Sequence, residues 1–186
     1  MLISKFSNCD VKEQIADMEK RYEITLPIQY KSFLHKYNGG YTPETKLKSG
    51  KISSDVRGFF GIGDVKLSIN TIELEEWLEK NVFPIACDSF GNYMVIGLCN
   101  DNLGKVYFCD HEKGNKLMYI ADDFKGFVNC CKSKKISEAS RRSIKEREEK
   151  LIAKGRGSII TDGLRKMWQA EIDKYGNMIQ EEVILD

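Results

Sequence analysis

The sequence lacks a long hydrophobic run, an excess of charge of either sign and an N-terminal apolar segment. No stretch of its 186 residues approaches the roughly 18 consecutive apolar residues that a membrane-spanning helix needs. The 29 basic and 28 acidic residues leave a net charge of +1, so the whole molecule has no electrostatic reason to bind nucleic acid or anionic lipid. The first residues turn polar too early for a secretory signal, and we expect a cytoplasmic protein.

Metal-ligand motifs are also missing. The chain has only two histidines, and its six cysteines match neither paired CxxC zinc motifs nor a small secreted disulfide framework. These cysteines are Cys9, Cys87, Cys99, Cys109, Cys130 and Cys131. We interpret them as free, buried thiols in a reducing compartment, because an unpaired cysteine packs as a small hydrophobic residue. We expect no metal and no cofactor.

Motifs for catalysis are weak. Asp110-His111-Glu112 follows a predicted strand and could supply a metal ligand or general base, but no second ligand pair has suitable spacing, which favours a turn that ends the strand. The sequence GFFGIG at residues 58–63 is neither a phosphate-binding loop nor GxGxxG, and no GxSxG motif occurs. We therefore predict a protein without catalytic residues.

The apolar pattern predicts two helices first, over residues 10–22 and 26–37; Pro27 begins the second and Asn38-Gly39-Gly40 ends it. The remaining predicted elements follow in chain order: a surface loop at 41–57, a short strand at 58–63, an acidic helix around 72–79, strands at 82–87, 93–98, 105–110 and 117–120, and a helix after Asp122 or Asp123. Consecutive strands joined by short turns indicate an antiparallel meander. The predicted class is α+β, a single domain with an antiparallel or mixed sheet flanked by helices, plus a C-terminal helical extension.

Charge divides the chain into three predicted segments. Residues 1–131 carry a net charge of −2 and form the predicted domain. Residues 132–158 hold ten basic and four acidic residues, and we interpret them as a basic linker, either an exposed helix or a partly ordered arm. Residues 159–186 place apolar side chains on one helical face, so we expect this segment to dock on the core or on a partner. That face consists of Leu164, Met167, Trp168 and Ile172.

Two charged regions are candidate binding sites. The first is acidic and consists of Glu73, Glu75, Glu76 and Glu79. Such a face is commonly only solvated, and its functional interpretation is attraction of a basic protein partner. The second is the basic segment 132–158, which could neutralise phosphates. Its interspersed glutamates and its lack of base-stacking aromatic residues favour a solvated helix over nucleic-acid binding.

Several motifs, taken in order, resemble a known family. "LPIQYKSFLHKYNGG" is similar to the signature of the SUKH superfamily (SMI/KNR-type domains), in which a leucine-proline opens a helix, aromatic residues lie along it and Asn-Gly-Gly closes it. "GFFGIGD", "VFPIACDSFGNYMVIGL" and "KVYFCDHE" resemble the strands that follow it in that family. The resemblance covers roughly residues 10–131, and its specificity lies in the ordered set of motifs.

The resemblance implies an α+β domain that binds proteins and has no catalytic residues. Bacterial members are mostly immunity proteins that neutralise toxin domains, often nucleases, whereas fungal relatives regulate cell-wall synthesis. We therefore expect a bacterial immunity protein that blocks the active site or substrate groove of a cognate toxin. The alternatives are a regulatory scaffold that binds a host protein and, less favoured, a nucleic-acid binder that uses the basic linker.

Overall fold

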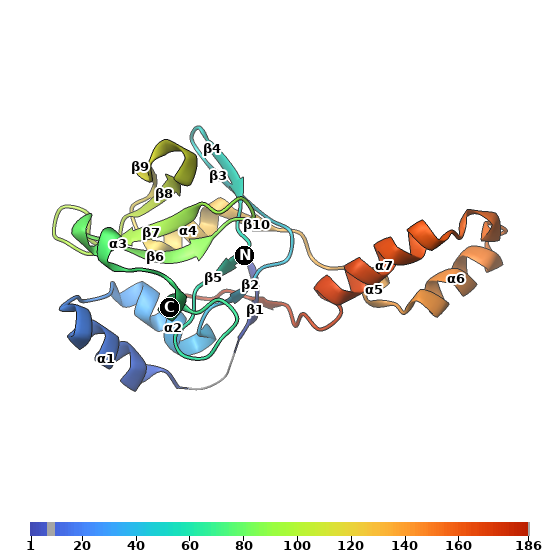
Figure 1. Cartoon of the computed structure of the whole chain (residues 1–186), viewed down its shortest axis with the longest axis horizontal. Helices are drawn as coiled ribbons and strands as arrows, with labels where there is room; N and C mark the ends of the chain where they lie inside the picture. The colour runs from blue at the N-terminus through green and yellow to red at the C-terminus, as the bar shows by residue number, and fades with distance from the viewer. Residues whose placement is uncertain (7–9, 186) are drawn as a thin grey trace. The chain divides into compact units, whose positions relative to one another are not determined.

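The structure is a computed structural model that describes residues 1–6 and 10–185 (Figure 1). It divides into two compact units. The first comprises Met1–Lys134 and the residues from Glu181 onward, and the second comprises Lys135–Gln180. Within the described part of the chain, no helix has both the length and the apolar character to cross a membrane.

The first unit is built on an eight-stranded sheet, and every pairing between its strands is antiparallel. From one edge to the other, the strands are β11 (Glu181–Glu182), β1 (Leu2–Lys5), β2 (Gly40–Tyr41), β5 (Gly58–Phe59), β6 (Val82–Cys87), β7 (Tyr93–Gly97), β8 (Val106–Asp110) and β9 (Lys116–Ala121). Helices cover this sheet, so the predicted α+β class is confirmed, and the sheet is antiparallel rather than mixed.

Strands β6 to β9 lie where alternating and apolar runs predicted them, with ends that differ by at most one residue. Tight turns join them, as expected for a meander. By contrast, only Gly58 and Phe59 of the predicted strand at 58–63 are in a strand. After these two residues the chain passes close to the end of a helix at Gly61, and Gly63 has a left-handed backbone with φ 85°.

The prediction of a surface loop at residues 41–57 was wrong. Strand β3 (Thr45–Ser49) pairs with β4 (Ile52–Asp55) in a hairpin, and β10 (Cys131–Ser133) adds to the other side of β3. Thr45 and Leu47 are buried, while the lysines that alternate with them are exposed. Leu47 is the only strongly apolar residue of β3, so the alternation of buried and exposed side chains along this strand was hard to recognise in the sequence.

Three helices contribute buried apolar side chains to the main hydrophobic core, which they share with strands of the eight-stranded sheet. These helices are α1 (Lys12–Tyr22), α2 (Ile28–Tyr37) and α4 (Phe124–Cys130). The ring of Phe33 on α2 lies 5.1 Å from that of Phe124 on α4 and 5.0 Å from that of Phe59 on β5. Aromatic pairs in tilted arrangements at such distances add to the stabilisation from burial alone. The aromatic stripe of α2 is therefore the centre of the core.

Asn38 ends α2 and ties it to the chain that follows β5. Its backbone is left-handed, with φ 44° and ψ 48°, and its N–H donates to the carbonyl of Leu34 at 2.8 Å. Its side chain is 3% exposed; Nδ2 donates to the carbonyl of Ile62 at 3.0 Å and Oδ1 accepts from the N–H of Ile62 at 2.8 Å. A Cβ on Gly61 would collide with the Asn38 carbonyl, so this close approach requires glycine at position 61.

The second unit contains α5 (Glu138–Arg141), α6 (Ile144–Ala153) and α7 (Asp162–Tyr175), and none of these helices has a fully buried side chain. Arg147 holds them together. Its guanidinium pairs with Glu171 at 2.7 Å, donates to the carbonyls of Ser140 and Arg142, and lies 5.8 Å from the ring centre of Trp168. This unit is organised by one central arginine rather than by an apolar core.

The apolar face predicted for residues 159–186 is only partly packed. Leu164, Trp168 and Ile172 are half-buried, whereas Met167 is exposed. Farther along, β11 pairs with β1, and Val183 is buried in the first unit. Docking of the helical part of this segment on a partner remains a prediction.

Replacing Asn38 should destabilise the first unit strongly. Asn38→Ala leaves the buried N–H and carbonyl of Ile62 without partners and puts alanine, which tolerates the left-handed conformation less well than asparagine, at this position, so we expect a loss of about 3 kcal/mol in the free energy of unfolding. Asn38→Gly relieves only the backbone strain, and its loss should be about 1 kcal/mol smaller. Urea denaturation measures both values.

Asn115 provides a matched control, because its φ is 54° and its side-chain Oδ1 has no hydrogen-bond partner among the described residues. Asn115→Ala should therefore lower the free energy of unfolding only because alanine tolerates the left-handed backbone less well than asparagine, by about 1 kcal/mol. Equal losses for Asn38→Ala and Asn115→Ala would show that the two hydrogen bonds to Ile62 contribute nothing.

Candidate functional site

The acidic residues predicted to bind a partner lie on and just before helix α3 (Glu75–Glu79), which follows a 3-10 turn at Ile69–Thr71. The helix is shorter than predicted. All four of these side chains are exposed: Glu73, Glu75, Glu76 and Glu79. Glu76 pairs with Lys80 at 3.2 Å, and no other ion pair engages the four carboxylates within the described residues. The structure thus gathers three uncompensated glutamates on one short segment.

Helix α3 is anchored from beneath by Trp77. The Trp77 side chain is 4% exposed and meets the ring of Tyr93 edge-on, with 5.4 Å between ring centres. The ammonium of Lys80 lies 5.5 Å from the centre of the Trp77 ring. After the helix, the carbonyl of Asn81 accepts hydrogen bonds from the N–H of Leu98 and from the side chain of Asn102. The glutamates therefore project from a fixed platform.

Electrostatics indicate what this segment attracts. Like charges on a fixed short helix produce a local negative potential, although the first unit as a whole carries few excess charges. At physiological ionic strength, salt limits the range of such a potential to about 8 Å. The potential therefore acts only on a partner that has already come close to this surface. What this segment presents to an approaching molecule is therefore negative charge.

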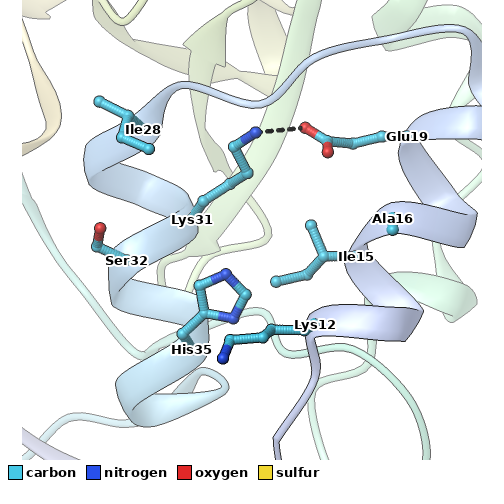
Figure 2. A pocket seen from close by; sticks show the side chains of 8 residues that line it. All are labelled: Lys12, Ile15, Ala16, Glu19, Ile28, Lys31, Ser32 and His35. Carbon is cyan, nitrogen blue, oxygen red and sulfur yellow. Dashed lines mark ion pairs between the residues drawn. The ribbon is translucent and has the colours of Figure 1, made fainter.

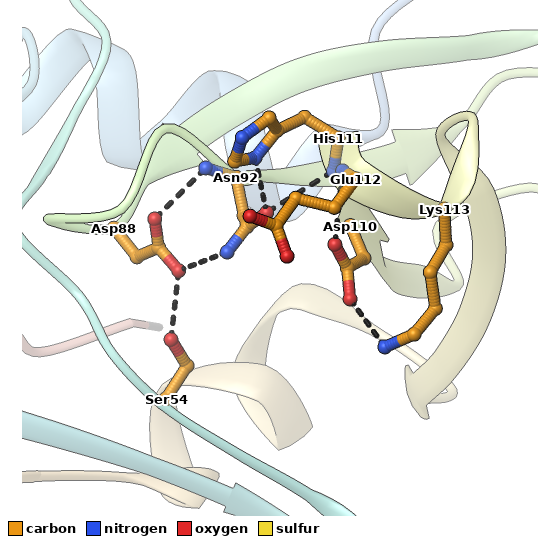
Figure 3. Close-up of polar contacts among 7 residues, drawn as sticks. All are labelled: Ser54, Asp88, Asn92, Asp110, His111, Glu112 and Lys113. Atoms are coloured by element: carbon orange, nitrogen blue, oxygen red, sulfur yellow. Dashed lines mark hydrogen bonds and ion pairs between the residues drawn. The ribbon is translucent and has the colours of Figure 1, made fainter.

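The turn between β6 and β7 is held by a buried carboxylate, shown in Figure 3. Asp88 is 2% exposed and accepts hydrogen bonds from the N–H of Phe90, the N–H and side chain of Asn92, and the hydroxyl of Ser54, at 2.7 to 2.9 Å. Asn92 Oδ1 in turn accepts from the N–H of His111 and lies 2.8 Å from His111 Nδ1. These polar groups serve to fix two neighbouring turns.

The motif Asp110-His111-Glu112 does end a strand, as predicted. Asp110 is the last residue of β8, and its carboxylate accepts the N–H of Glu112 at 3.1 Å and pairs with Lys113 at 2.6 Å (Figure 3). The hydrogen bond from Lys113 holds the pKa of Asp110 below its ordinary value. Across the described residues, no three His, Cys, Asp or Glu side chains converge as metal ligands.

The five described cysteines are unpaired thiols, and Cys9 lies outside the described residues. Cys87, Cys109 and Cys131 are buried, whereas Cys99 and Cys130 are half-buried. Burial raises the pKa of Cys87 to about 11 and that of Cys109 and Cys131 to about 12. The three buried thiols therefore stay protonated at neutral pH, which is typical of structural cysteines.

A shallow groove of about 280 Å³ lies between α1 and α2, as Figure 2 shows. Glu19 and Lys31 pair across it at 3.2 Å, and Glu19 also accepts the N–H of Leu26 at 2.6 Å. The groove falls below the size of most small-molecule sites, about 300 to 1,000 Å³, and its carboxylate already has partners. These features are typical of the contact between two packed helices rather than of a ligand-binding site.

The predicted basic linker is divided between the two units. Its first residues belong to β10 of the first unit, and the remainder lies in the second unit. Arg147 pairs with Glu171, as described above; outside the predicted linker, Arg165 of the same unit pairs with Glu148 and Asp162. At least one arginine of the linker is therefore occupied inside the protein and is less available to phosphates.

No sequence motif pointed to Tyr107, Leu117 and Tyr119 on β8 and β9 as binding residues. Tyr119 is 50% exposed, and the other two are half-buried. Alternation along VYFCD and KLMYIA was the available signal, because it places these three residues on one face of the sheet. Composition alone does not distinguish such a face from one covered by a helix.

Comparison with known proteins adds two findings. The SUKH_6 family model, described as SMI1-KNR4 cell-wall, matches residues 12–128, which include α3 and the meander. The chain is also 27% identical over 151 residues to the SPbeta prophage-derived uncharacterized protein YokK of Bacillus subtilis (strain 168). That alignment covers 67% of this chain and 76% of the relative.

Thiol reactivity tests the assignment of the cysteines. Because the thiolate is the nucleophile, we expect iodoacetamide at pH 8 to modify Cys87, Cys109 and Cys131 at least about tenfold more slowly than Cys99 and Cys130. Peptide mapping by mass spectrometry follows each cysteine separately. In concentrated urea the rates should converge, and rapid modification of Cys109 in the folded protein would contradict its burial.

Proposed function

The chain belongs to the SUKH family of SMI1-KNR4-type domains, and on this premise we propose that it is an immunity protein that binds a cognate toxin domain. Binding blocks the active site or the substrate groove of the toxin, and the immunity protein itself performs no chemistry. The match to the family over residues 12–128 carries the proposal. The relative named above is prophage-derived, which accords with a role in competition between genetic elements.

The acidic segment around α3 suggests which toxins fit. A nuclease must attract phosphates and therefore presents a basic substrate groove. The exposed carboxylates of Glu73, Glu75 and Glu79, free of ion pairs within the described residues, offer such a groove negative charges in place of phosphates. Complementary charge accelerates encounter and orients the partners. We propose a nuclease toxin that the protein meets in the cytoplasm.

A regulatory scaffold that binds a host protein would use the same kind of surface. The two functions differ in genetic context, because an immunity protein requires a toxin gene beside its own. A stable endogenous partner in the absence of any neighbouring toxin gene would favour the scaffold. Binding of generic DNA or RNA that weakens with added salt would instead favour nucleic-acid recognition.

Co-expression tests the proposal directly. The toxin encoded next to this gene should arrest growth when expressed alone, and co-expression of the full chain should restore growth. Asn38→Ala, which weakens the fold, should restore growth poorly at elevated temperature. Continued killing in the presence of abundant folded protein would refute the immunity function.

The acidic segment should control the rate of association. Changing Glu73, Glu75, Glu76 and Glu79 to glutamine should lower the association rate constant about tenfold at low salt, because charge complementarity steers encounter. The difference should shrink at high ionic strength. Stopped-flow or surface plasmon resonance with the purified, catalytically inactivated toxin measures both rates.

Helix α1 provides the matched control, because it carries four exposed acidic residues on or next to it. They are Asp10, Glu13, Asp17 and Glu23. Their conversion to Asn or Gln removes the same charge from another place and should change the association rate little. If both quadruple variants slow association equally, net charge rather than the α3 segment steers the encounter.

A further inference from the structure

The face of the sheet opposite α2 and α4 has two cross-strand rows of side chains. In one row Val95 lies beside Tyr107, and Tyr107 lies beside Tyr119. In the next row Tyr93, Cys109 and Leu117 are neighbours in the same way. Since side chains on a strand alternate between faces, these six residues all point away from the main core.

Helix α3 covers only part of this face. Trp77 packs with Val82, Val95 and Cys109 in a second, smaller apolar cluster. On β8 and β9 the cover is incomplete: Tyr119 is 50% exposed, and Tyr107 and Leu117 are half-buried. The rings of Tyr107 and Tyr119 meet edge-on, with 6.2 Å between their centres. We call Tyr107, Leu117 and Tyr119 the tyrosine face.

The tyrosine face has acidic neighbours on two sides. Trp77 and Tyr93 connect it to α3 and its glutamates. Beyond Tyr119, the exposed carboxylate of Asp122 raises the pKa of the Tyr119 hydroxyl. Lys116 alternates with Leu117 and therefore belongs to the opposite face, whereas the Lys80 ammonium lies over the Trp77 ring and is paired with Glu76. An apolar, aromatic centre with a negatively charged rim matches a positively charged partner.

The face of β9 is a better docking site than its edge. Strand β9 ends the sheet, and a bare edge strand could accept an added strand. However, the hydroxyl of Ser49 on the β3–β4 hairpin donates to the carbonyl of Ile120 at 2.7 Å. The register between β8 and β9 also shifts next to Tyr107, and such an irregularity discourages strand addition.

We propose that the tyrosine face is the apolar centre of a docking surface for a basic protein, with the α3 glutamates as its rim. The partner seats an apolar patch, flanked by lysine or arginine side chains, on Tyr107, Leu117 and Tyr119. A second copy of this chain fits poorly, because a symmetric pairing would bring two acidic rims together. The identity of the partner as the cognate toxin rests on the proposed function.

Centre and rim have different kinetic roles. Charged rims act mainly on association, whereas buried aromatic anchors act mainly on dissociation. Tyrosine is among the residues most often found at the energetic centre of interfaces. Loss of a ring should thus shorten the lifetime of the complex and leave its formation almost unchanged.

The test uses the full chain and, as probe, the purified and catalytically inactivated product of the neighbouring toxin gene. Tyr119→Ala should raise Kd about tenfold or more, mostly through faster dissociation at any salt concentration, as expected for an interface anchor. Tyr119→Lys should weaken binding further by adding a positive charge to the docking surface. Tyr119→Phe, which keeps the ring, should bind nearly as well as the unchanged protein.

Phe90 is the matched control, because its side chain is 72% exposed at the tip of the Asp88–Asn92 turn. Phe90→Ala should leave Kd unchanged, and urea midpoints should show that every variant remains folded. If Tyr119→Ala and Tyr119→Lys bind the probe with the same Kd as the original protein, and the original protein still protects cells, the docking surface is refuted and the proposed function stands. Failure of the unchanged protein to bind the probe would overturn both this inference and the proposed function.

Discussion

The first unit depends on the way Asn38 ends helix α2. Its left-handed backbone stops the helix, and its side chain pairs with both polar groups of the Ile62 backbone. The chain then enters β2, which lies between β1 and β5, so one residue fixes the helix against the sheet. A buried amide that pairs with both the N–H and the carbonyl of one residue allows only one relative placement of these segments. The aromatic stripe of α2 meets its partners on β5 and α4 because of this placement.

Alternation along the central strands has two consequences at once. Every second residue of β7 and β8 belongs to the core beneath α2 and α4, and the residues between them form the opposite face. Helix α3 is too short to cover that face, and it brings its glutamates next to the part that stays open. The core and the candidate docking surface therefore share the same strands, which gives the surface a rigid support.

Local sequence signals account for much of this fold. Apolar strands bounded by turn residues revealed the meander, and a proline start with an Asn-Gly-Gly end revealed α2. The β3–β4 hairpin escaped because Leu47 is its one strongly apolar side chain and its partner β10 lies far along the chain. The acidic segment was visible as four glutamates, and the structure added that they are exposed and flank an open sheet face. The tyrosine face could not be predicted, because only tertiary packing decides which half of a face a helix covers.

The pairing of β1 with β11 also constrains the order of assembly during synthesis. Strand β1 leaves the ribosome well before its outer neighbour at Glu181 and Glu182, because more than 170 residues separate the two strands along the chain. Until then, one edge of the sheet has unpaired backbone groups, the condition under which nascent chains associate wrongly. In chain order, the second unit is synthesised after β10 and before β11. Its length therefore sets how long the edge at β1 stays unpaired after the other strands have been made. Translation speed through residues 135–180 therefore bears on the yield of correctly closed protein.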